Sequence, residues 1–192
     1  MLKRLTSGIL SIVLLIGMLP HITLKANAAY YPENWKTWGQ WEQPWGQQLM
    51  LPGNETLGQV GCWVSSYAKA YIQAGLVPDD MTDYNLGTFC TWASKHNVLD
   101  YNCCITGPGF DMLRCWPDGD LKNPALIQEG DLRISVAGMS REQIVAKLTE
   151  LRNAGKMVIL RVKNNGHSTL VGDPFINDDG VADIELYDTG WS

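Results

Sequence analysis

The chain has 192 residues, of which 45% are hydrophobic and 18% charged, and its 20 acidic side chains outnumber 15 lysines and arginines. The resulting net charge of −5 argues against nucleic acid or an anionic membrane surface as the partner, because both require clustered Lys and Arg. The sequence contains no internal repeat and no low-complexity linker, which favours a single folded domain.

The N-terminal segment has the three parts of a secretory signal peptide. A basic end is followed by an apolar run over residues 8–19, which is too short to span a bilayer, and by the small-residue stretch 26–29. We therefore expect residues 1–29 to be removed and residues 30–192 to form one secreted domain with a sizeable core. The mature chain then has 12 basic against 20 acidic side chains, a net charge of −8, and no further apolar run that would hold it in a membrane.

The sequence around Cys62 predicts a cysteine at the start of a helix. We expect this helix near Cys62–Gly75, because apolar side chains recur at helical spacing and Gly75 marks the end of the pattern. A helix N-terminus carries unpaired backbone N–H groups and the positive end of the helix dipole, and both stabilise a thiolate. Gly58 and Gly61, in the loop expected before the helix, let a substrate backbone come close.

All five cysteines lie in the expected mature chain. In an oxidising compartment, an odd number leaves at least one thiol without an internal partner. Cys90, Cys103, Cys104 and Cys115 lie close enough in sequence to pair among themselves, although the two adjacent cysteines are unlikely partners for each other, so Cys62 is the natural odd one out. The alternative is five reduced cysteines, some of them buried as small hydrophobes. No C-x-x-C pair or matching histidine spacing indicates a zinc site.

A second helix is expected near Asp83–Lys95 and a third near Ser140–Ala154. His96 directly follows the second helix, where the helix dipole stabilises a protonated imidazole. Ser140 and Gln143 form a capping-box pattern at the start of the third helix, which we expect to be structural.

His167 is the other histidine of the mature chain and the candidate base. It follows the expected buried strand Met157–Val162 and a turn at residues 164–166, and it opens the expected strand His167–Val171. A histidine that enters a strand after a tight turn can project at the end of the sheet, toward a cleft. Without Cys62, a half-buried structural histidine would be the simpler interpretation.

Asp188 is the candidate that orients the His167 ring. It follows the hairpin pattern Asn177–Gly180 and the alternating strand Val181–Tyr187, so it ends a strand that neighbours the strand of His167 in an antiparallel sheet. Asp173 is closer to His167 in sequence, but Asp173-Pro174 is typical of a turn.

The chain order of helix-start cysteine, strand histidine and strand-end aspartate resembles that of the papain-like cysteine peptidases. It is similar in particular to secreted bacterial relatives of the double-glycine, bacteriocin-processing peptidases. Members of that group carry a Q-x-x-x-x-W segment, a T-[IL]-x-x-x-G-C-x-x-[ST]-S helix start, a G-H strand and a final aspartate. Here these motifs are residues 40–45, residues 56–66, Gly166-His167 and Asp188. The resemblance implies an α+β, papain-like fold, in which a helical part carrying the cysteine packs on an antiparallel sheet carrying the histidine and the aspartate.

The reaction implied by this arrangement is acyl transfer to water. The Cys62 thiolate attacks a peptide or related amide carbonyl, His167 takes and then returns the proton, and Asp188 holds the His167 ring. Gln40 is expected to complete the oxyanion hole, because it belongs to the glutamine motif of the family, whereas Gln59 is expected to face solvent. We expect no cofactor and no metal, and a monomer that acts on a peptide or protein substrate.

Two alternatives remain open. The chain departs from the family pattern at Trp63, which replaces a small residue beside the thiol, and at Ser168-Thr169, which replace an aromatic residue and a valine. A non-catalytic binding module on the same fold would use the Trp-rich segment at residues 35–45 together with the cleft. The same triad also suits an amide hydrolase or acyltransferase with a non-peptide substrate.

Overall fold

The computed structural model describes residues 12–16, 32–120, 122–123, 126, 133–162 and 166–190. Within these ranges, one five-stranded sheet has the strand order β2-β1-β3-β4-β5, and every neighbouring pair of strands is antiparallel. The strands are β1 (Ile12–Ile16), β2 (Arg133–Ile134), β3 (Met157–Val162), β4 (His167–Ile176) and β5 (Ala182–Tyr187). The described chain is therefore a mixed α+β structure with an antiparallel sheet, as expected.

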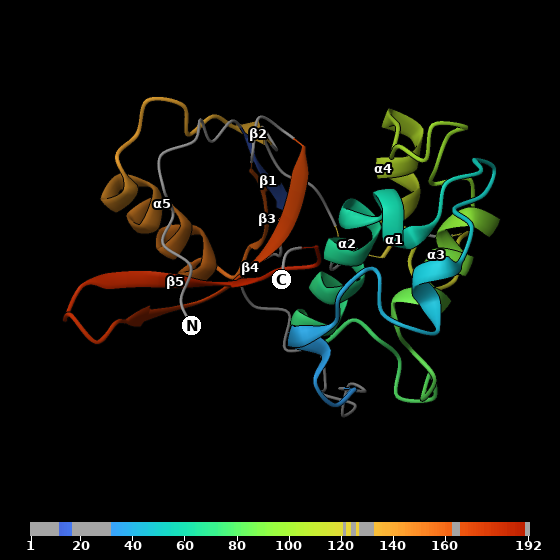
Figure 1. The fold of residues 1–192 in the computed structure, drawn as a ribbon, viewed down its shortest axis with the longest axis horizontal. Helices are drawn as coiled ribbons and strands as arrows, with labels where there is room; N and C mark the ends of the chain where they lie inside the picture. Colours follow the sequence, from blue (N-terminus) through green and yellow to red (C-terminus); the bar gives the residue numbers. More distant parts are fainter. Residues whose placement is uncertain are drawn as a thin grey trace.

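Helices lie on both sides of the sheet (Figure 1). They are α1 (Leu57–Val60), α2 (Cys62–Gln73), α3 (Leu86–Lys95), α4 (Gly107–Leu113) and α5 (Arg141–Asn153), with the short 3-10 helices η1 (Trp35–Thr37) and η2 (Trp45–Gln47). Helix α5 lies on one side, and α1 to α4 lie together on the other, where α2 packs on β3 and β4. Among the described segments, none forms a helix with the length and apolar character needed to cross a bilayer.

The sheet separates two hydrophobic clusters, because alternate residues of a strand point to opposite faces. On the side of α5, Val158 and Leu160 pack with Leu148. On the side of α2, Ile159 and Leu170 join a larger cluster that is formed mainly by the helices. Burial of both strand faces explains why β3 begins with a continuous apolar run, Met157–Leu160.

Helix α2 begins at Cys62, as predicted. The apolar residues expected on its inner face are all buried: Val64, Tyr67, Ala68, Tyr71 and Ile72. Gly75 follows the helix with a φ of 65°, a left-handed conformation that favours glycine. The loop expected over Gly58–Gly61 is wrong, because the short helix α1 occupies most of it. Thr56 and Gln59 form a capping box that satisfies the first N–H groups of α1.

The other two predicted helices are confirmed, with one shifted start. Helix α3 begins three residues later than expected, because the Asn85 side chain accepts hydrogen bonds from the backbone N–H groups of Gly87 and Thr88 and so fixes the helix start there. Helix α5 begins after Ser140, which forms the predicted capping box with Gln143.

The strands that carry the candidate site also follow the prediction. Strand β3 has the predicted bounds, and β4 begins at His167 but continues to Ile176. The turn expected at Asp173-Pro174 is wrong: both residues lie inside β4, where an irregularity in the pairing with β5 between Val171 and Pro174 accommodates the proline. Residues 164–165 of the expected tight turn lie outside the described residues.

Strand β1 lies within the expected signal peptide. It pairs with β3 from Ile12↔Arg161 to Ile16↔Met157, and on its other side it pairs with β2. Cleavage near residue 29 would remove this strand and leave the edge of β3 unpaired. The pairing of β3 with β4 and of β4 with β5 does not involve β1.

Candidate active site

Three residues that are far apart in sequence meet where α2 packs on the sheet. Cys62 is the first residue of α2, His167 is the first residue of β4, and Asp188 directly follows β5. Because β4 and β5 are antiparallel, the start of β4 and the end of β5 lie at the same edge of the sheet. Helix α2 contacts β4, which brings the thiol to the same place. We refer to these three residues as the triad.

Asp188 binds one side of the His167 ring. The distance between His167 Nε2 and Asp188 Oδ1 is 2.7 Å, and the same carboxylate oxygen accepts a hydrogen bond from the backbone N–H of Gly190 at 3.0 Å. Burial by itself would raise the pKa of Asp188, but the hydrogen bonds and the charge of His167 lower it. Since Nε2 faces the carboxylate, Nδ1 is the ring nitrogen left for Cys62.

His167 is held in the protonated form by its two neighbours. The residue is only 5% exposed, and this burial by itself would lower the pKa of the ring. Hydrogen bonds to Asp188 and Cys62, together with their negative charges, raise the pKa to about 9. The imidazolium is therefore the dominant form at neutral pH.

The surroundings of Cys62 lower the pKa of its thiol. Burial would raise the pKa of this half-buried group, but the hydrogen bond and positive charge of His167, with a hydrogen bond from the Ser168 backbone, lower it below the ordinary value of 9.0. The first turn of α2 adds the positive end of the helix dipole. The arrangement stabilises the thiolate–imidazolium pair, which is the reactive form of a nucleophilic cysteine.

The other cysteines have a different character. All five are free thiols, and Cys90, Cys103 and Cys115 are buried, which agrees with the alternative of small hydrophobic side chains. Burial raises the pKa of Cys90 to about 11. Partial burial and the charge of Asp100 also raise the pKa of the exposed Cys104. Cys62 is the one cysteine whose pKa is shifted downward among those with a resolved shift.

Gln40 lies beside the triad, whereas Gln59 does not. The backbone N–H of Gln40 donates to the carbonyl of Thr189 at 2.6 Å, and its Nε2 donates to the carbonyl of Gly58 at 3.0 Å. The residue is buried, with 6% exposed. Gln59 is exposed, as expected, and its Oε1 accepts the Thr56 N–H in the cap of α1. Of the two glutamines, the structure brings Gln40 to the site.

The remaining candidates lie elsewhere in the fold. His96 is the C-cap of α3, and its ring packs on Trp92 with a centroid distance of 4.9 Å, as expected for a structural histidine. Asp173 forms an ion pair with Arg152 at 3.4 Å and accepts a hydrogen bond from the Tyr187 hydroxyl at the same distance.

The indole of Trp63, next to Cys62 in the sequence, packs between the helices and the sheet. Its ring lies 6.1 Å from that of Tyr67 and 6.2 Å from that of Phe110, measured between centroids. The guanidinium of Arg161, on β3, lies 5.4 Å from the Trp63 ring. These contacts fix the orientation of the wide Trp63 side chain.

Two residues of the site were not predicted from the sequence. Lys69 in α2 is fully buried, and its Nζ donates to the carbonyls at the end of β5. Gly190 lies against the ring of His167: a Cβ atom at this position would lie 2.5 Å from His167 Cε1 and 3.2 Å from Gln40 Oε1. In the sequence, Lys69 is distinguished as the one charged residue between Cys62 and Gln73.

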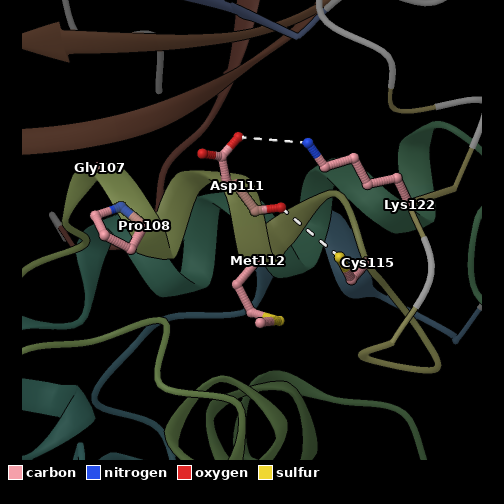
Figure 2. A pocket seen from close by; sticks show the side chains of 6 residues that line it. All are labelled: Gly107, Pro108, Asp111, Met112, Cys115 and Lys122. Atoms are coloured by element: carbon pink, nitrogen blue, oxygen red, sulfur yellow. Dashed lines mark hydrogen bonds and ion pairs between the residues drawn. The ribbon is translucent and has the colours of Figure 1, made fainter.

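A separate hollow lies beside α4 and does not involve the triad (Figure 2). Its lining residues are Gly107, Pro108, Asp111, Met112, Cys115 and Lys122. Asp111 and Lys122 form an ion pair at 4.0 Å across it. In the part of the chain that the structure describes, no three His, Cys, Asp or Glu side chains gather as a metal site would require.

Comparisons of the chain with models of known protein families, with curated proteins and with solved structures found no match.

Proposed function

We propose that the chain is a secreted cysteine peptidase with a papain-like fold, which hydrolyses a peptide bond through Cys62, His167 and Asp188. The observation that carries this proposal is the continuous chain of contacts from the Cys62 thiol through the His167 ring to the Asp188 carboxylate. A cysteine activated by a histidine, with an acidic residue orienting the histidine, is the arrangement used for nucleophilic acyl transfer.

The proposed reaction has two halves. The Cys62 thiolate attacks the carbonyl carbon of the substrate, and His167 gives its proton to the departing amine as the C–N bond breaks, which leaves a thioester on Cys62. His167 then takes a proton from water, the hydroxide attacks the thioester, and the carboxylic acid product leaves as the thiolate forms again. Asp188 stays ionised throughout and stabilises the imidazolium.

The oxyanion of each tetrahedral intermediate needs hydrogen-bond donors. Cys62 is in the first turn of α2, where backbone N–H groups have no partner within the helix. The Gln40 carboxamide has two N–H bonds, and one of them serves the Gly58 carbonyl. We assign the second N–H bond of Gln40 and the backbone N–H of Cys62 to the oxyanion hole.

Secretion and the type of fold belong to the same proposal. The signal-peptide pattern at residues 1–29 supports export, and the two-part architecture supports the papain-like fold, since a helix with the nucleophile at its start packs on an antiparallel sheet that carries the base. The substrate is proposed to be a peptide or protein, and the enzyme a monomer that needs no cofactor.

The experiment that tests this function is cleavage of a diverse peptide library, read by mass spectrometry. The wild-type chain should generate new peptide ends, and Cys62→Ala should generate none. Cys104→Ala is the matched control, because it removes an exposed thiol outside the triad and should leave cleavage intact. Intact peptides in the presence of a protein whose Cys62 is reactive would overturn the peptidase assignment and favour a non-peptide amide. An unreactive Cys62 would favour the binding module.

A further inference from the structure

Lys69 is a buried cation on the same helix as the nucleophile. It lies about two turns after Cys62 in α2, and it is 0% exposed. Its Nζ donates to three backbone carbonyls, at 3.0 Å to Asp188, at 3.1 Å to Lys36 and at 3.4 Å to Tyr187. One ammonium group therefore joins α2 to η1 and to the segment that follows β5.

The number of donors matches the number of acceptors only in the charged form. An ammonium has three N–H bonds, one for each carbonyl, whereas a neutral amine has two N–H bonds and a lone pair. After loss of the proton, the lone pair would face a carbonyl oxygen, and two oxygen or nitrogen lone pairs repel each other. A buried polar group without a partner is costly, so the three carbonyls should not keep this arrangement around a neutral amine.

The segment that Lys69 holds is the one that positions the His167 ring. Its Asp188 side chain binds His167, while its Asp188 carbonyl binds Lys69. Thr189 is fixed on both sides: its carbonyl accepts the backbone N–H of Gln40 at 2.6 Å, and its hydroxyl donates to the Ser168 carbonyl at 3.2 Å. Lys69 ties this segment to α2, the helix of Cys62.

We propose that Lys69 is a positioning residue whose ammonium holds the Asp188 backbone against α2, so that the grip of Asp188 on His167 depends on the protonation of Lys69. The consequence for catalysis rests on the proposed function, but the positioning itself does not. With this role, Lys69 is a further proton-dependent group of the site, in addition to the thiol and the imidazole.

The charges around Lys69 set the pH range of this effect. Burial lowers the pKa of Lys69 to about 8, against the opposing negative charges of Asp188 and Glu42. Lys36 and Glu185, the charged groups that flank this site, contact each other and Tyr187. Lys36 Nζ lies 3.9 Å from Glu185 and 4.8 Å from the Tyr187 ring, and the Tyr187 hydroxyl donates to Glu185. The Asp188 contact should thus be intact below about pH 8 and loosen above it, before His167 itself loses its proton at about 9.

The test is an NMR titration of the full chain that follows the backbone carbonyl ¹³C of Asp188 and the ring of His167. In the wild type, the ¹³C chemical shift of the Asp188 carbonyl should change with a midpoint near pH 8, as Lys69 loses its proton. Lys69→Arg keeps a cation that does not titrate in this range, so the transition should vanish while His167 keeps its raised pKa. Lys69→Met keeps an unbranched side chain, one heavy atom shorter and without the charge, so the transition should vanish and the pKa of His167 should fall.

Alkylation of Cys62 by iodoacetamide supplies a second readout. Lys69→Met should slow it at neutral pH by up to about tenfold, because a displaced Asp188 lowers the pKa of His167 by about one unit and weakens the thiolate–imidazolium pair by the corresponding factor. Lys69→Arg should restore the rate. Both measurements use the thiol and the ring directly, and neither requires a peptide substrate.

The possible outcomes separate this inference from the proposed function. An Asp188 carbonyl that does not titrate near pH 8 in the wild type overturns the positioning role, and so does a Lys69→Met chain with unchanged His167 and Cys62. If Lys69→Met does not fold, the titrations of the wild type and of Lys69→Arg still test the positioning role. A carbonyl that titrates as expected in a chain that cleaves no peptide supports the positioning role and contradicts the peptidase.

Discussion

Asp188→Asn removes the charge beside His167 while it keeps a hydrogen-bond acceptor of the same size. The pKa of His167 rises from 6.5 to about 9 in the folded chain, and at about 1.4 kcal/mol for each pH unit this is a preference of about 3 kcal/mol for the imidazolium. Asp188 and Cys62 share this preference, and 38% of the Asp188 side chain is exposed, which screens its charge. Assigning half to Asp188, on the order of 1.5 kcal/mol, we expect the pKa of His167 to fall by about one unit.

The assay for this prediction is an NMR titration of the histidine rings. The expected mature chain has two histidines, so a His96→Gln variant assigns the His167 resonance. The Asp188→Asn chain should show His167 titrating at about 8. A His167 pKa that stays at about 9 in the variant would refute the role of the carboxylate charge, and a wild-type value near 6.5 would refute the ion pair itself.

Three further predictions address the base, the oxyanion hole and export. His167→Ala should abolish iodoacetamide labelling of Cys62 at low pH, and His96→Ala should leave it nearly intact. The opposite result would mean that His96, and not His167, is the base. Gln40→Ala should lower kcat by about 10²-fold with labelling of Cys62 preserved, while Gln59→Ala should keep kcat and lose about 1 kcal/mol of stability from the helix cap. If only Gln59→Ala loses turnover, the hole must be built around that residue. N-terminal sequencing of the exported protein should begin near residue 29 or 30, and an exported chain that retains β1 would exclude signal cleavage there.

The sequence alone was sufficient for the parts of the site that local patterns encode. Helical spacing placed Cys62 at a helix start, and the alternation of β5 placed Asp188 at the end of a strand beside that of His167. Chain order then suggests a triad, because two antiparallel strands joined by a hairpin place the start of the first strand beside the end of the second. The capping box that forms α1 was also present in the sequence, at Thr56 and Gln59, but the glycines around it favoured a loop.

Other features depend on contacts between distant segments and have no local pattern. Lys69 looks like an exposed residue by type, and its burial becomes understandable only when carbonyls from η1 and from the end of β5 are seen to converge on it. The proline after Asp173 is typical of a turn, but pairing on both sides of β4 carries the strand through it. Helix α4 begins Gly107-Pro108-Gly109, a sequence with low helix propensity that the cap from Thr106 offsets.

The pH dependence of iodoacetamide labelling at Cys62 tests the central claim, an activated thiol paired with His167, most directly. The rate at Cys62 should rise with a pKa below the ordinary thiol value of 9.0. In the same sample, the exposed Cys104 should react only at higher pH, because its pKa is raised. A Cys62 rate that follows an ordinary thiol, in parallel with Cys104 or at still higher pH, would contradict the thiolate–imidazolium pair and the catalytic role assigned to it.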